Sequence, residues 1–225
     1  ARLEPAADAF RVVASGPMAD GTVVIPADFT AGRPLSLDMR RLVLQPAPPV
    51  PGAGPASPTD PRDLPAIAAR AEDFTWQGRH FGRLVATVDR VPQGLRLASL
   101  ATEAKDFTLG GTGTWLAEGQ GSRTRLALEF KSTNLAAASR ALGYRDVVDA
   151  EQAHVNANLT WTGGPDADSI ARMDGSLRLE LDRGQLRGVK PGAGRILGLT
   201  SVTALPRRLA LDFRDVTDEG LAFDT

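Results

Sequence analysis

Residues 124–130 read TRLALEF, and the order of side chains in this stretch decides the fold. Leu126, Leu128 and Phe130 occupy every second position, separated by a small and a charged residue. Successive side chains of a β-strand point to opposite faces of its sheet, so this period of two places the three apolar side chains together. We therefore predict a strand with one apolar and one polar face.

The same alternation recurs along most of the chain, in HVNANLTW (154–161), SLRLELD (176–182), RLALDF (208–213), GLRLASL (94–100) and PLSLDM (34–39). The runs are separated by short Gly- and Pro-containing turns, which suit antiparallel hairpins and leave no room for repeated crossover helices. The sequence thus predicts an all-β fold, mainly a curved antiparallel sheet.

Two stretches interrupt the alternation with short helices. Residues 132–144 have Thr133 or Asn134 as a helix cap, alanines in the middle and Gly143 as a stop. Residues 192–205 form the second predicted helix, which Pro206 ends. The Pro-rich residues 46–63 have no apolar periodicity and are predicted to be a flexible loop within a single domain spanning 1–225.

The composition excludes several classes of function. The 225 residues carry a formal net charge of -1, and only 5% of them are aromatic, so neither a basic surface nor a stacking platform for nucleic acid is expected. Cysteine is absent, which excludes thiolate chemistry and Cys-ligated zinc. No run of about 18 consecutive apolar residues is present to form a membrane span.

The glycine-rich residues 191–213 do not match the pattern of a phosphate-binding loop. The glycines around Arg195 lack the following Lys and hydroxyl of a Walker loop, and no βαβ unit surrounds them. Arg195 at a helix start could bind an anion, although a plain strand-to-helix turn is favoured. Arg207 and Arg208 are either head-group contacts or a solvated strand start, and the second interpretation is favoured.

No catalytic or metal-binding pattern was found. His80 and His154 have no partner at metal-ligand spacing, and no nucleophile elbow occurs. Asp212, Asp215 and Asp218 stand three residues apart, whereas a calcium loop needs ligands two apart. We expect no metal, no cofactor and no enzymatic activity.

Three stretches carry a resemblance to a known family. These are TLGGTGTWL (108–116), ALGYRDVVDAEQAHVNANLTWTGGP (141–165) and the C-terminal residues 184–225, and they resemble the large YhdP branch of the AsmA-like superfamily. The resemblance is specific over about 107–225 and vague before residue 66. It implies that residues 191–213 are a structural turn, helix and strand near the end of a long β-groove.

The resemblance also implies a function and a location. Members of this branch are large Gram-negative proteins that an upstream helix anchors in the inner membrane and that span the periplasm towards the outer membrane. They are thought to be bridge-like lipid transporters. The implied partners are phospholipid acyl chains and the outer membrane, and this chain would be a C-terminal segment.

A one-sided sheet must cover its apolar face, by folding into a sandwich or by lining a groove that lipid occupies. For the groove, the expected acyl-chain contacts are the period-two positions Leu95, Leu97, Leu126, Leu128, Phe130, Val155, Leu159, Trp161, Leu177, Leu179, Leu181, Leu209, Leu211 and Phe213. Ordinary core packing is an equal alternative for each leucine. The alternative function is a docking module whose own helices, 134–142 and 193–205, plug the groove.

Overall fold

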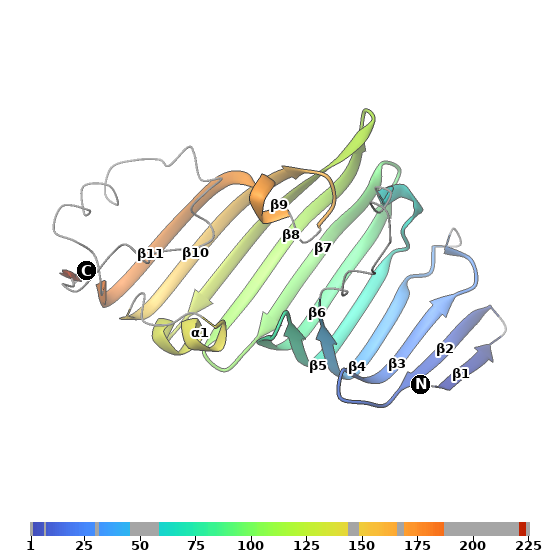
Figure 1. The fold of residues 1–225 in the computed structure, drawn as a ribbon, viewed down its shortest axis with the longest axis horizontal. Coiled ribbons are helices and arrows are strands. Elements are labelled where there is room, and N and C mark those ends of the chain that lie inside the picture. The colour runs from blue at the N-terminus through green and yellow to red at the C-terminus, as the bar shows by residue number, and fades with distance from the viewer. Residues whose placement is uncertain are drawn as a thin grey trace, which may run out of the picture.

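The structure is a computed structural model that describes residues 2–6, 8–29, 32–45, 59–143, 149–165, 169–186 and 221–223. All described strands form one curved, open sheet of twelve strands in the order of the chain (Figure 1). The strands are β1 (Arg2–Ala6), β2 (Ala9–Ala14), β3 (Ala19–Pro26), β4 (Leu35–Leu44), β5 (Ile67–Trp76), β6 (Arg79–Val91), β7 (Gly94–Glu103), β8 (Phe107–Glu118), β9 (Gly121–Ser132), β10 (Asp149–Thr162), β11 (Asp174–Leu186) and β12 (Leu221–Phe223).

The prediction of a mainly antiparallel sheet is confirmed, with one exception. Strands β4 and β5 are parallel, with Leu35 opposite Ile67 and Leu44 opposite Trp76. A parallel pair needs a connection that returns the chain to the starting end of the first strand. The Pro-rich stretch joins these two strands, so it is the crossover of this sheet.

The register gives the sheet one apolar face and one polar face. Thr102, Leu109, Phe130, Val155 and Leu179 are Cα partners across five consecutive strands, β7 to β11. Cross-strand partners project from the same side of a sheet, so these residues belong to one surface, which we call the apolar face. Neighbouring rows such as Thr108, Lys131, His154 and Glu180 form the polar face.

One of the buried clusters lies at the end of the strands that carries helix α1 (Leu135–Ala141). Phe107 stacks on Phe130 with ring centroids 5.4 Å apart and meets Phe81 edge-on at 5.9 Å. Ala138 of α1 is fully buried against this cluster. The helix therefore caps the apolar face instead of standing in solvent.

Helix α1 confirms the prediction of a helix within 132–144. Asn134 is its N-cap and accepts a hydrogen bond from the Ala137 amide at 2.9 Å, while Gly143 follows the helix with a φ of 81°. The second predicted helix, 192–205, lies outside the described residues.

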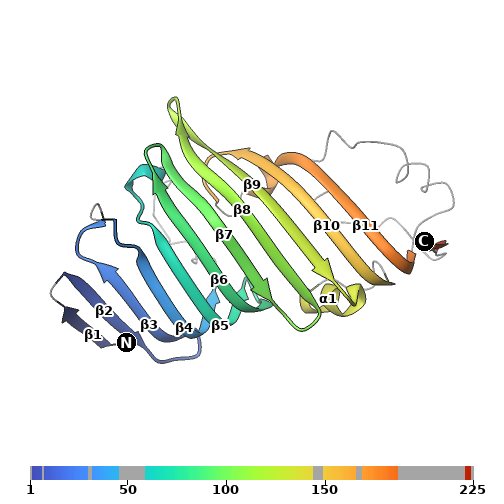
Figure 2. The ribbon, with the colours of Figure 1, turned by 180° about the vertical axis from the view of Figure 1, so that it is seen from behind.

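Two described 3-10 helices lie at the other end of the strands, away from α1. They are η2 (Pro61–Asp63), which falls inside the predicted loop 46–63, and η3 (Ser169–Arg172). Both lie on the same side of the sheet as α1, as the front and back views show (Figures 1 and 2). The apolar face is thus bounded at both strand ends, by α1 at one and by η2 and η3 at the other.

Candidate functional site

The predicted groove residues that the structure describes all share the apolar face. They stand in rows across the sheet, because cross-strand partners fall in register from β7 to β11. These residues are Leu95, Leu97, Leu126, Leu128, Phe130, Val155, Leu159, Trp161, Leu177, Leu179 and Leu181. Leu209, Leu211 and Phe213, and the candidate head-group contacts Arg195, Arg207 and Arg208, lie outside the described residues.

These residues differ in accessibility. Leu95 and Trp161 are 7% and 4% exposed, whereas Leu177 and Leu179 on β11 are 45% and 47% exposed. The Trp161 indole donates to the Gly164 carbonyl at 2.8 Å, in the loop that leads to η3. The buried pair is therefore covered by the chain itself, whereas the exposed pair is accessible to solvent.

Strand β8 contributes apolar-face residues that the sequence prediction missed, namely Phe107, Leu109 and Trp115. Gly111 and Gly113 occupy the same face and interrupt the alternation of large apolar side chains along the strand. Leu128 fills the space above Gly111, since a Cβ there would stand 2.6 Å from the Leu128 Cδ2. Counting glycines as members of the face would have revealed the period of two in TLGGTGTWL.

Part of the connection between β4 and β5 packs against one end of the apolar face. We call residues 59–66 of this connection the strap. Pro61 is buried, and its Cβ lies 2.9 Å from where a Cβ on Gly94 would be. Only a residue without a side chain admits the proline this close at that position. The contact therefore holds the strap against the start of β7.

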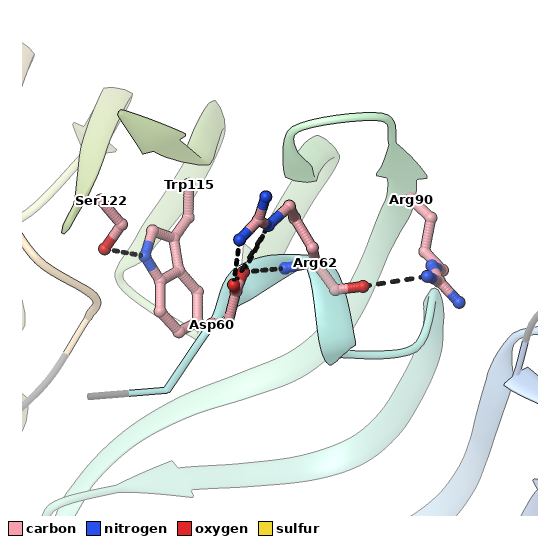
Figure 3. A network of polar contacts seen from close by, with 5 residues as sticks. All are labelled: Asp60, Arg62, Arg90, Trp115 and Ser122. Atoms are coloured by element: carbon pink, nitrogen blue, oxygen red, sulfur yellow. Dashed lines mark hydrogen bonds and ion pairs between the residues drawn. The ribbon is translucent and has the colours of Figure 1, made fainter. Parts of the chain in front are cut away.

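An ion pair within the strap shapes its turn (Figure 3). The Asp60 carboxylate accepts hydrogen bonds from the Arg62 amide at 2.9 Å and from the Arg62 guanidinium at 2.6–3.1 Å. The hydrogen bonds from the Arg62 side chain, and then that from its amide, lower the pKa of Asp60 to about 2. The carboxylate is therefore ionised at neutral pH and the pair stays closed.

Arginines of β6 contact the caps at both ends of the apolar face. Arg79 donates from Nε to the carbonyl of Leu142, just after α1, at 2.8 Å. Arg90 donates to the carbonyls of Phe29 and Arg62, each at 2.9 Å (Figure 3). Between the caps, in β7, β8 and β9, the apolar face carries no charged side chain.

On the polar face several charged side chains form ion pairs with one another. Glu118 accepts from Arg123 at 2.7 Å and Arg125 at 2.9 Å, and hydrogen bonds from these two guanidiniums lower its pKa. Glu129 pairs with Lys131 and His154, each at 2.8 Å, and the pKa of Glu129 is lowered in the same way. Exposed pairs of this kind add little stability but keep this face hydrated.

Within the described part of the chain, no three His, Asp or Glu side chains gather as a metal site. The described helices include none with the length and apolar character needed to cross a bilayer. The distinctive feature is therefore the apolar face, whose chemistry suits non-covalent contact with hydrocarbon.

An open β-sheet with one apolar face and caps at both strand ends defines the class as a β-groove protein. The chain belongs to the YhdP family, because the family model described as YhdP protein matches residues 1–225. It is also 27% identical over 165 residues to the intermembrane phospholipid transporter YhdP of Escherichia coli strain K12. That match covers 73% of this chain and 13% of the relative. No solved structure matches the chain.

Proposed function

We propose that this chain is a segment of a bridge-like lipid transporter and that it carries phospholipid along the apolar face. The observation that carries the proposal is a sheet of twelve strands whose apolar side has short caps but no second sheet among the described residues. Apolar surface of this extent is unusual in a soluble monomer unless a partner or ligand covers it. The relative's name identifies that protein as a phospholipid transporter.

The dimensions of the face suit an acyl chain. Phe107 and Trp115 lie at opposite ends of the apolar side of β8 and are eight residues apart, which corresponds to about 26 Å of strand. Each buried methylene contributes about 0.8 kcal/mol whether it enters a bilayer or an apolar groove. The two environments are therefore nearly equal in free energy, which allows a lipid to move between them without a chemical step.

The proposed mechanism needs generic apolar contacts and no catalyst. Leucine, valine and phenylalanine side chains hold hydrocarbon without directional bonds, so a lipid can slide from one row of the sheet to the next. The proposed location is the periplasm, with the whole protein anchored in the inner membrane and reaching the outer membrane. The chain is proposed to act without enzymatic activity.

The test is native mass spectrometry and lipid extraction of the purified chain. We expect co-purified phospholipid that is lost in the variants Leu128→Asp and Leu179→Asp, because a carboxylate on the apolar face must be desolvated beside hydrocarbon. The matched controls are Ala127→Asp and Ser176→Asp, which place the same charge at exposed positions of the polar face in the same strands. The controls should keep the lipid.

A folded chain that contains no lipid in any variant would contradict the transport proposal. It would favour a docking module that uses its caps to fill the groove and engages an outer-membrane or periplasmic partner. The burial of Leu95 and Trp161 beneath the caps is the observation that supports this second candidate. Circular dichroism of each variant would show whether loss of lipid follows from loss of fold.

A further inference from the structure

We propose that Arg90 is a binding site for the phosphate of a lipid head group at the capped end of the apolar face. The inference rests on the proposed function, because it concerns the polar end of a ligand whose acyl chains lie on that face. Arg90 is the cross-strand partner of Leu95, and Leu95 pairs in turn with Trp115, so the β6 position of Arg90 belongs to the apolar face.

Within the described part of the chain, no carboxylate forms an ion pair with Arg90. Its hydrogen-bond acceptors among the described residues are two backbone carbonyls, those of Phe29 and Arg62. The other arginine at this place, Arg62, is neutralised by the two-oxygen contact with Asp60. Arg90 therefore places at this end of the face a positive charge that no described carboxylate neutralises.

The guanidinium of Arg90 is also held in place and retains unused donors. A guanidinium has five N–H donors in a fixed plane, and the two carbonyls use one donor on each terminal nitrogen. The Nε–H and one hydrogen on each terminal nitrogen remain for a further acceptor. A planar fork of this kind matches two oxygens of a phosphate group, and holding it in advance lowers the entropy lost on binding.

The surroundings of Arg90 indicate a lipid phosphate in preference to a free anion. Val88 lies two residues along the same strand and on the same face, about 7 Å away by strand geometry. Arg90 itself is exposed, so a bound phosphate would stay in water. A molecule with a phosphate at Arg90 can therefore lay its acyl chains over Val88 and Leu97 without burying its own charge.

The experiment compares two ligands with the same acyl chains. Dihexanoylphosphatidylglycerol carries the phosphate and dihexanoylglycerol lacks it, and both are titrated calorimetrically into the 225-residue chain. We expect the phospholipid to bind about tenfold more tightly, as a charge-assisted contact to an exposed guanidinium would give. Arg90→Gln should remove this preference and leave the affinity for dihexanoylglycerol unchanged.

Two control variants separate charge from structure. Arg96→Gln removes an arginine from β7 that is paired with Asp89 at 2.8 Å, and it should keep the preference. Pro61→Gly loosens the strap, whose Arg62 carbonyl helps to hold the guanidinium, but keeps the charge of Arg90, so the preference should weaken without disappearing. If Arg90→Gln kept the tenfold preference, or Pro61→Gly abolished it, the assignment to Arg90 would be overturned.

The remaining outcomes distinguish the source of the phosphate and the two proposals. Inorganic phosphate binding at Arg90 as tightly as the phospholipid would overturn the lipid assignment. Binding of dihexanoylglycerol without any preference for the phospholipid would overturn the site at Arg90 and leave the transport proposal standing. Failure of both lipids to bind would contradict the transport proposal itself.

Discussion

At the scale of single residues, Gly82 shows how one backbone position directs a side chain into the core. Thr75 is opposite His80 and Phe74 is opposite Gly82, so Phe81 is the extra residue of a β-bulge. Gly82 has a φ of 73°, a conformation that glycine adopts without strain. The bulge turns Phe81 towards Phe74 and Phe107, whose rings lie 5.9 Å away in each case.

We expect Gly82→Ala to lower the free energy of unfolding by about 2–4 kcal/mol. The alanine would be strained at this positive φ, and its Cβ would also clash with neighbouring backbone. A Cβ at this position would collide with the Glu103 carbonyl and stand 2.8 Å from the Ala104 Cα. Gly78→Ala is the matched control, because Gly78 has a φ of 75° and nothing within 4 Å of its Cβ position. Equal urea midpoints for the two variants would show that the clash relaxes freely.

Phe107 and Leu177 share the apolar face but differ in burial, at 3% and 45% exposure. Phe107→Ala should cost about 3–5 kcal/mol of stability because it leaves a cavity beneath α1. Leu177→Ala should cost less than about 1 kcal/mol, because its side chain is already half in water. Chemical denaturation checks both values, and a large loss for Leu177 would mean that another part of the chain covers it.

At the scale of elements, the strap depends on local electrostatics as well as on packing. The folded-state pKa of Asp60, about 2, is below its usual range, so the ion pair contributes stability above the usual value of about 3.9. That contribution is lost as the pH falls through about 2. The Asp60–Arg62 ion pair should therefore be intact at neutral pH, and the strap should loosen only in strong acid.

Carbon-detected NMR of the Asp60 carboxyl measures the folded-state pKa of Asp60 directly. We expect its titration near pH 2 in the native chain. In Arg62→Gln we expect a return to about 3.9, since the principal cause of the shift is removed. Arg96→Gln, on the opposite face of the sheet, should leave the Asp60 titration unchanged. A normal Asp60 pKa in the native chain would mean that the pair is open in solution.

At the scale of the whole molecule, the sheet is a linear array in which each strand pairs only with its neighbours in sequence. Stability in such an array is a sum of local interfaces, so it need not be uniform. The buried core residues lie on β4 to β10 and on α1, whereas Leu3 of β1 and Phe10 of β2 are 63% and 45% exposed. The N-terminal edge is thus the weakly held part of the described sheet.

Amide hydrogen exchange should reproduce this gradient. Amides of β8 and β9, which pair with each other along twelve residues and are each paired with a further strand, should exchange slowest, and those of β1 and β2 fastest. The physical reason is that opening the edge breaks one short interface, whereas opening the centre breaks two long ones. Uniform protection across the sheet would contradict the array description and indicate a single cooperative unit.

The sequence alone predicted alternating runs in five of the described strands, a short helix within 132–144 and the face on which the leucines lie, because these depend on local period and capping. Leu126, Leu128 and Phe130 could be assigned to one face without knowledge of any neighbour. Three features depend on contacts between distant residues: the parallel pairing of β4 with β5, the burial of Leu95 and the hydrogen bonds of the arginines at the caps. Only the tertiary structure decided them, because pairing order and coverage of a face arise from packing, which local periodicity does not encode.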